Sequence, residues 1–229
     1  MPEGSRGMIV TKPKPFRKIK QFTDPHENIL VVGCNTCTAV CLAGGEKEAE
    51  QLAARIRLHR RRQGLGGSVE TVTVLRQCEH EFNEEIAEMV EGRDLLLSTA
   101  CSIGPQALAE RYTGVRVAPA MNTNMLGMVK EHHVWSEYCV ACGDCGIYKT
   151  GGICPIARCA KQLFNGPCGG SQGGRCEISP DVDCVWQQIH DKMVSLGLED
   201  DLKKIMGPKN WSWSNHGGPR TLKKEGFQP

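Results

Sequence analysis

Residues 29–34 read Ile29-Leu30-Val31-Val32-Gly33-Cys34, and this short stretch decides the fold class. Its first four residues are all apolar, so the segment has no polar face to turn toward water. Such a run is typical of a strand buried on both sides, as in the parallel sheets of α/β proteins. The glycine ends the predicted strand, and the cysteine after it lies at the strand's carboxyl end.

Strands and helices continue to alternate from this stretch to about residue 120. Ala49, Leu52, Ala53 and Ile56 follow the i, i+3, i+4, i+7 spacing of an amphipathic helix over 46–62. Further strands are predicted at 69–75, 94–98 and 115–118, and further helices at 83–90 and 105–112. The alternation predicts a Rossmann-like parallel sheet domain with right-handed crossovers, assigned to residues 29–125.

The segment before the sheet, residues 1–28, is predicted to be an N-terminal arm. Pro13 and Pro15 interrupt its basic part, so no regular helix should span it. The arm is either a solvated tail or a partner-wrapping segment anchored by Phe16 and Ile19.

A small cysteine-rich, metal-organised domain is predicted to follow the sheet, over residues 126–206. Residues 121–125 should form a loop, and residues 136–180 are rich in glycine and cysteine with little periodic pattern. Too few apolar side chains are present to offset the entropy of ordering this segment, so metal binding must organise it.

The end of the chain is predicted to be helical and then irregular. A helix should begin at Ser179-Pro180-Asp181, with a serine cap and proline in the first turn, and end at Gly197. Its buried stripe should contain Val182, Val185, Trp186, Ile189 and Met193. A short amphipathic helix should cover 198–206. The tail, 207–229, carries Trp211, Trp213 and Phe227 and is either disordered or docked on a partner.

Thirteen cysteines carry the chemistry of the chain. The spacings Cys34-x2-Cys37-x3-Cys41 and Cys139-x2-Cys142-x2-Cys145 are tight enough for metal ligands. All thirteen are candidate ligands: Cys34, Cys37, Cys41, Cys78, Cys101, Cys139, Cys142, Cys145, Cys154, Cys159, Cys168, Cys176 and Cys184.

The five upstream cysteines are predicted to meet at one edge of the sheet. Cys34, Cys37 and Cys41 follow the first predicted strand, Cys78 follows the second and Cys101 the third. The carboxyl edge is where open α/β sheets place their ligands, so four of the five should share one cofactor. The alternative is five independent buried core cysteines.

Metal competes with disulfides as the explanation for so many thiols. No signal-like segment opens the sequence and the cysteine count is odd, which favours a reduced, cytoplasmic metalloprotein. A triple of cysteines and a Cys154-Pro155 pair follow the logic of ferredoxins, and no histidine lies within the dense cysteine block. We therefore expect two or three [4Fe-4S] clusters, with zinc possible at one site.

The net charge of +2 gives no indication of a nucleic-acid or membrane partner. No apolar run is long enough to span a bilayer. The basic run His59–Arg62 either complements a helix dipole or docks an acidic electron carrier such as ferredoxin.

The segment Leu163–Glu177, with Gly166-Pro167-Cys168-Gly169-Gly170 at its centre, resembles the methylenetetrahydrofolate reductase C-terminal family. Gly151–Pro155 and Asp183–Trp186 resemble it too, and Gly33–Cys41 resembles the MetV-type cysteine-rich subunit that contains this domain. The resemblance covers most of residues 29–206 and leaves the arm and tail outside.

The resemblance implies an electron-transfer subunit of a methylenetetrahydrofolate reductase complex in one-carbon metabolism, of the kind used in the Wood–Ljungdahl pathway. A MetF-type flavoprotein partner would hold the FMN and the folate, and this chain would hold clusters through its matching cysteines. Two alternatives remain open: a structural zinc subunit that stabilises the catalytic partner, and a module for a corrinoid or methyl-transfer partner.

Overall fold

The computed structural model describes residues 9–131, 133–215, 218–219 and 221. The chain divides into two compact units, Met1–Ser136 and Glu137–Pro229. The sequence placed the corresponding boundary near residue 125. No helix in the described part of the chain is long and apolar enough to cross a membrane.

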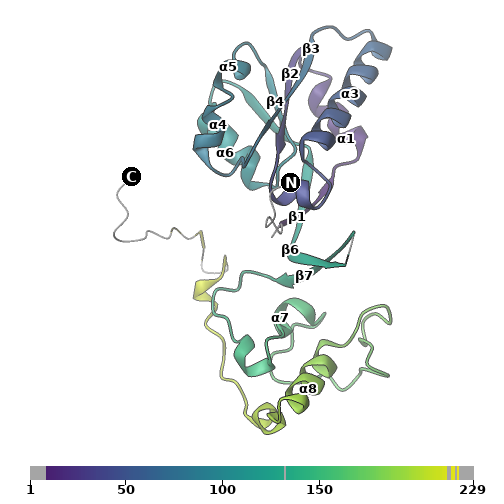
Figure 1. Ribbon diagram of the computed structural model, residues 1–229, viewed down its shortest axis with the longest axis vertical. Helices are drawn as coiled ribbons and strands as arrows, with labels where there is room; N and C mark the ends of the chain where they lie inside the picture. Colours follow the sequence, from purple (N-terminus) through teal and green to yellow (C-terminus); the bar gives the residue numbers. More distant parts are fainter. Residues whose placement is uncertain (1–8, 132, 216–217, 220, 222–229) are drawn as a thin grey trace. The chain divides into compact units, whose positions relative to one another are not determined.

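A four-stranded parallel sheet forms the centre of the first unit (Figure 1). Its strands are β2 (Asn28–Cys34), β3 (Ser68–Val74), β4 (Leu95–Ser98) and β5 (Arg116–Pro119), in the order β3-β2-β4-β5. The chain therefore builds outward from β2 to β3 and then returns to the other side of β2 with β4. This reversal makes the carboxyl ends of β2 and β4 a topological switch point, where open α/β sheets bind ligands.

Helices cover both faces of this sheet (Figure 1). α1 (Phe16–Thr23) and α3 (Glu46–Gln63) lie on one face, and α4 (His80–Glu84), α5 (Ala87–Val90) and α6 (Ile103–Arg111) lie on the other. β2 serves both cores: Ile29 and Val31 pack in the cluster with α1 and α3, whereas Leu30 and Val32 pack in the opposite one. The prediction of a strand buried on both sides is confirmed.

Most predicted strands and helices of this unit are present within one or two residues. α3 ends at Gly64, whose φ of 68° is the left-handed conformation that glycine adopts at helix ends. The helix predicted over 83–90 is instead two short helices, α4 and α5, because the chain turns between Glu84 and Ala87. The basic run does close α3, but Arg60 is buried and donates to the carbonyl of Thr23.

The prediction of an N-terminal arm without regular structure is wrong over the described residues. β1 (Ile9–Pro13) and α1 form there, and Pro15 stands as the N-cap of α1. Proline is tolerated at this point because the first N–H groups of a helix have no intrahelical partner. Ile19 is only 1% exposed and packs in the core beneath α3, so neither a solvated tail nor a partner anchor describes it. Residues 1–8 lie outside the described residues.

A second sheet replaces the loop predicted at residues 121–125. β6 (Met121–Glu131) pairs antiparallel with β1, and the sheet order is β1-β6-β7, with β7 at Val134–Cys139. The polar stretch Asn122-Thr123-Asn124 hid this strand from sequence reasoning. The strand forms because β1 pairs with it, in a register that places Thr11 opposite Thr123 and Pro13 opposite Met121.

The second unit contains short helices connected by irregular segments. They are η1 (Ile147–Thr150), α7 (Pro155–Arg158), α8 (Val185–Ser195), η2 (Glu199–Lys203) and η3 (Trp211–Trp213). α8 starts five residues later than predicted, with Cys184 rather than Ser179 as its N-cap, and Val182 is exposed. Val185, Trp186, Ile189 and Met193 are buried as predicted. The helix predicted over 198–206 is the shorter 3-10 helix η2.

Candidate metal centres

Four of the five upstream cysteines lie at the carboxyl edge of the parallel sheet. Cys34 is the last residue of β2, and Cys37 is the first residue of the short helix α2 (Cys37–Val40). Cys78 lies in the turn after β3, and Cys101 lies between β4 and α6. Cys34 and Cys101 are buried, whereas Cys78 is exposed.

These four thiols act on one another electrostatically. Burial raises the pKa of the Cys78 thiol above its ordinary value, and negative charge on Cys34 or Cys101 raises it further. Burial likewise raises the pKa of Cys101, and charge on Cys34 and Cys37 adds to this, while the N–H groups of Ile103 and Gly104 oppose it. Coupling of this kind requires the four sulfurs to lie near each other. The fold therefore gathers residues that are up to two crossover connections apart in the sequence.

Cys41 does not join this group. It is buried in the core beneath β1, where its Sγ lies 3.5 Å from Thr11 Oγ1 and 3.5 Å from the carbonyl oxygen of Thr38. A thiol that hydrogen-bonds inside an apolar cluster behaves as a small core residue. The sequence grouped Cys41 with the edge ligands, and its packing removes it from them.

A second group of four cysteines surrounds a small cavity in the second unit. Cys159, Cys168, Cys176 and Cys184 line this cavity of about 20 Å³. Cys184 is the N-cap of α8 and Cys159 is the C-cap of α7, so two helix ends place two of the four. The sequence placed all eight downstream cysteines in one domain without grouping them.

A charged pair that sequence reasoning missed stands beside this second group. Lys161 Nζ lies 2.5 Å from Glu177 Oε2, and both residues line the same cavity. The bond to Lys161, and then one from the Cys168 thiol, lowers the pKa of Glu177. The bond to Glu177, with smaller effects from Cys168 and Cys176, raises the pKa of Lys161. The sequence contains two hints of this pair: a lysine two residues after Cys159 and a glutamate directly after Cys176.

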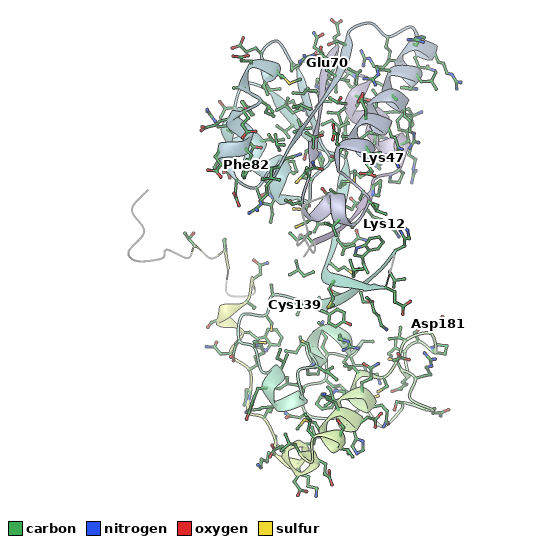
Figure 2. All side chains as sticks on the ribbon, in the orientation of Figure 1. Lys12, Lys47, Glu70, Phe82, Cys139 and Asp181 are labelled. Atoms are coloured by element: carbon green, nitrogen blue, oxygen red, sulfur yellow. The ribbon has the colours of Figure 1, made fainter. Side chains whose placement is uncertain are left out.

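The remaining four cysteines, Cys139, Cys142, Cys145 and Cys154, share no such cavity among the residues that the structure describes. β7 ends at Cys139 (labelled in Figure 2), whose Sγ accepts the N–H of Ala141 at 3.3 Å. Cys154 is the N-cap of α7, and its Sγ accepts the N–H of Ala157 at 3.4 Å.

The donor chemistry fits thiolate-bound metal, although the side chains would have to move inward to hold it. As they stand, no group of three or more His, Cys, Asp or Glu side chains within the described residues is arranged to hold a metal ion. Yet every cysteine is a free thiol, and two sets of four gather around common points. The raised pKa values of Cys78 and Cys101 favour the protonated thiols, and a cation such as zinc or iron would offset the cost of forming thiolates there.

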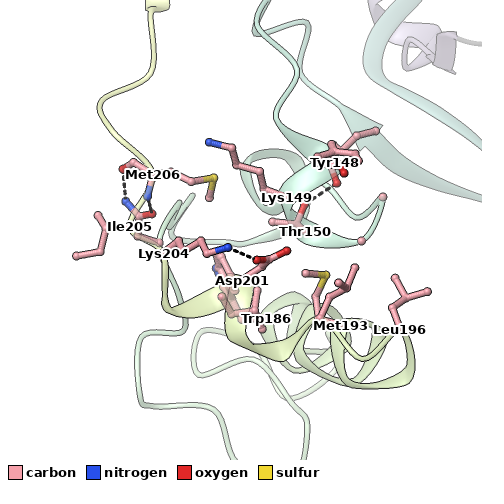
Figure 3. Close-up of a pocket in the computed structure, with 16 residues that line it drawn as sticks. Tyr148, Lys149, Thr150, Trp186, Met193, Leu196, Asp201, Lys204, Ile205 and Met206 are labelled. Atoms are coloured by element: carbon pink, nitrogen blue, oxygen red, sulfur yellow. Dashed lines mark hydrogen bonds and ion pairs between the residues drawn. The ribbon is translucent and has the colours of Figure 1, made fainter.

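The largest cavity identified in the second unit is apolar and contains no cysteine (Figure 3). It has a volume of about 720 Å³ and lies between η1, α8 and the η2 segment. Trp186 and Met193 of α8 form its buried part, and Tyr148 and Ile205 stand at its rim almost fully exposed. Lys204 pairs with Asp201 at 2.5 Å on one side. This cavity suits apolar contact rather than metal binding.

Comparison with known proteins gives one match. Residues 118–212 match a family model described as the C-terminal region of methylene-tetrahydrofolate reductase. No curated protein sequence and no solved structure matches the chain. The match contains all eight downstream cysteines and supports a relationship of this region to methylenetetrahydrofolate reductases. The parallel sheet lies almost entirely outside the matched region.

Proposed function

We propose that this chain is the iron–sulfur electron-transfer subunit of a methylenetetrahydrofolate reductase, of the MetV type, and that it passes electrons to the flavin of a MetF-type partner. The observation that carries the proposal is the gathering of Cys34, Cys37, Cys78 and Cys101 at the switch point of the sheet. The family match to the cysteine-rich region supports it independently. Iron–sulfur clusters exchange single electrons, which a flavin can collect in pairs.

The grouping of the cysteines gives each site its ligands. Cys34, Cys37, Cys78 and Cys101 would hold one cluster at the sheet edge, and Cys159, Cys168, Cys176 and Cys184 would hold another. Cys139, Cys142, Cys145 and Cys154 are left as a third set of four, in the segment with ferredoxin-like spacing. Cys41 is the thirteenth cysteine, and we assign it no metal.

The partner is proposed to dock at the sheet edge rather than on the N-terminal segment. Three large apolar side chains near the edge cysteines are about half exposed: Leu42 and Leu75 in the loops, and Ile103 at the start of α6. Cys78 is exposed among them, so a redox partner could approach this site closely. Phe16 and Ile19 pack in the unit's own core and are not available as anchors. Trp211 is partly exposed and lines a groove with Pro208 and Met206, whereas Phe227 lies outside the described residues.

A structural zinc role is the second candidate, and one observation favours it. Among the described residues of the second unit, the buried apolar side chains are few: Val185, Trp186, Ile189 and Met193 form one cluster, and Ile156 is also buried. A unit with so small a core needs crosslinks, and zinc supplies them without redox chemistry. Metal content distinguishes the two candidates.

The decisive experiment is elemental analysis of anaerobically purified protein together with a matched pair of cysteine variants. The electron-transfer proposal expects nearly equal iron and acid-labile sulfide and co-purification with a flavoprotein. Cys101→Ala should lose the iron of one cluster, because it removes a ligand of the sheet-edge site. Cys41→Ala should keep full iron content and lose only packing stability.

Three results would count against this proposal. Zinc without sulfide would support the structural role instead. Loss of iron in Cys41→Ala, with none in Cys101→Ala, would overturn the ligand assignment. Co-purification with a corrinoid or methyl-transfer protein in place of a flavoprotein would point to the third class of function.

A further inference from the structure

A wholly buried amide lies directly behind the sheet-edge cysteines. Gln77, the residue before Cys78, is 0% exposed. Its Nε2 donates to the carbonyl oxygens of Val32 at 2.8 Å and of Gly33 at 3.0 Å, immediately before Cys34. The side chain of one residue in the β3 loop thereby fixes the end of β2.

The same amide also holds the third cysteine-bearing loop. Gln77 Oε1 accepts a hydrogen bond from Ser98 Oγ at 2.6 Å, and that hydroxyl accepts the N–H of Ala100, next to Cys101, at 3.2 Å. α6 begins against the same side chain. A Cβ added at Gly104 would stand 2.8 Å from Gln77 Oε1 and 2.4 Å from the Cβ of Ala100, so only glycine allows this approach.

We propose that Gln77 is the positioning residue of the sheet-edge thiol site, because it joins the loops of Cys34, Cys78 and Cys101 through one side chain. The proposal deepens the proposed function and rests on it for the identity of the metal, but not for the role of Gln77 in placing the thiols. Asn83 Nδ2 donates to the backbone carbonyl of Gln77 at 2.8 Å and fixes the loop from behind.

The chemistry of this position calls for an amide. Two carbonyl oxygens need donors and one hydroxyl needs an acceptor, and glutamine supplies both from a single planar group. A glutamate would lose the donors and place negative charge behind thiolates. An apolar side chain would remove this partner from the Gly33 carbonyl, the Ser98 hydroxyl and the Val32 carbonyl, and each lost hydrogen bond costs free energy. The cost is smallest at the Val32 carbonyl, which still accepts from the N–H and hydroxyl of Thr99. Groups that support ligands in this way commonly change metal affinity about 10- to 100-fold when replaced.

The test compares Gln77→Met with a matched variant, Arg60→Met. Arg60 is also a buried polar residue that donates to two backbone carbonyls, of Thr23 and Gly66, but these precede β2 and β3 at the opposite edge of the sheet. Both variants therefore remove buried hydrogen bonds from the same unit. Only Gln77→Met removes hydrogen bonds at the edge of the sheet that carries the cysteines.

The measurement is the alkylation rate of each cysteine in the full chain as purified, with N-ethylmaleimide and an iron and zinc chelator present, followed by mass spectrometry. In Gln77→Met we expect Cys34, Cys78 and Cys101 to react about tenfold faster than in the wild type. The eight downstream cysteines should react at unchanged rates. Arg60→Met should leave the sheet-edge rates within about twofold of the wild type, even if its melting temperature falls equally.

Ser98→Ala provides a milder second variant, should Gln77→Met fold poorly. It removes the link from Gln77 to Ala100 and keeps the bonds to Val32 and Gly33, so Cys101 should respond more than Cys34. Equal alkylation rates in Ser98→Ala and wild type, or equal increases in Gln77→Met and Arg60→Met, would overturn the role of Gln77. If the wild-type protein contained no iron as purified, while Gln77→Met still reacted faster than both the wild type and Arg60→Met, the proposed function would fail and the positioning role would stand.

Discussion

The two units of this chain use opposite means to hold cysteines in place. In the first unit, apolar cores on both faces of a parallel sheet fix the backbone, and the edge cysteines are delivered by strand ends. In the second, the buried apolar cluster consists of four residues along α8, Ile156 of α7 is also buried, and eight cysteines lie in the surrounding segments. In the first unit, apolar packing places the cysteines. In the second unit, metal binding by the cysteines would hold the surrounding segments together.

The first unit is expected to be folded by packing alone, whereas the second is expected to depend on crosslinks. Val31 and Leu97 are completely buried by the sheet and its helices, so the first unit can keep its shape without metal. The second unit has few comparable contacts and must offset the ordering entropy of long irregular segments. Its stability should therefore depend on ligand bonds.

The largest expected effect is the loss of the second unit when metal is removed. Chelation or oxidation of the protein should unfold residues 137–215 while the parallel sheet persists, because metal binding in small metal-organised domains contributes on the order of 10 kcal/mol. Amide NMR would show loss of dispersed signals from α8 and retention of those from β2 and β4. Metal-free protein with dispersed signals throughout both units would remove the distinction between them.

The reverse experiment weakens the first unit alone. Leu97→Ala creates a cavity in a fully buried strand and should cost about 2–5 kcal/mol in the free energy of unfolding. Leu58→Ala, on the exposed face of α3, is the matched control and should change it by less than about 0.5 kcal/mol. Denaturant unfolding followed by circular dichroism gives both values. Metal bound by the downstream cysteines should be the same in the two variants, and a large loss of it in Leu97→Ala would show that the units are not independent.

The parallel sheet and its edge site could be predicted because they follow local rules. Ile29–Val32 has one pattern that suits only a strand buried on both faces, and cysteines at strand ends must meet once strands are parallel. The exception is Cys41, whose side chain points into the core under β1. No pattern near Cys41 reveals this, since β1 lies thirty residues upstream and its pairing with β6 is not encoded locally.

The remaining differences come from tertiary contacts that override local signals. Two prolines suggested an unstructured arm, but α1 begins after the second of them and buries Ile19. Asn122 and Asn124 suggested a loop, but β1 supplies a partner strand. Ser179-Pro180 has the sequence of a helix start, yet the N–H of Val182 bonds the Ser179 carbonyl in a turn, and Cys184 takes the cap position. Gln77 escaped notice because a single glutamine carries no periodic signal.

The smallest expected effect concerns the pH dependence of the first unit without metal. Burial raises the pKa of Cys78 and of Cys101 in the folded state, with smaller contributions from the neighbouring thiolates, whereas in an unfolded chain the thiol pKa is about 8.5. A group whose folded pKa is raised contributes its full share of stability below the unfolded pKa and loses it as pH rises through the folded one. The metal-free sheet should therefore be most stable below about pH 8 and should lose stability as the pH rises above about 8.5 and through the raised pKa values of the folded state.

Thermal unfolding of chelated protein at a series of pH values, followed through the β-sheet signal, measures this loss. The double variant Cys78→Ala, Cys101→Ala should flatten the decline, because the two thiols that favour protonation are gone. Cys41→Ala is the matched control, since it also removes a thiol of this unit but not one at the sheet edge, and its decline should follow that of the wild type. A wild-type protein with constant stability across this interval would mean that the edge thiols titrate alike in the folded and unfolded chain. The four sulfurs would then be too far apart or too well solvated to share a metal without a larger rearrangement of their loops.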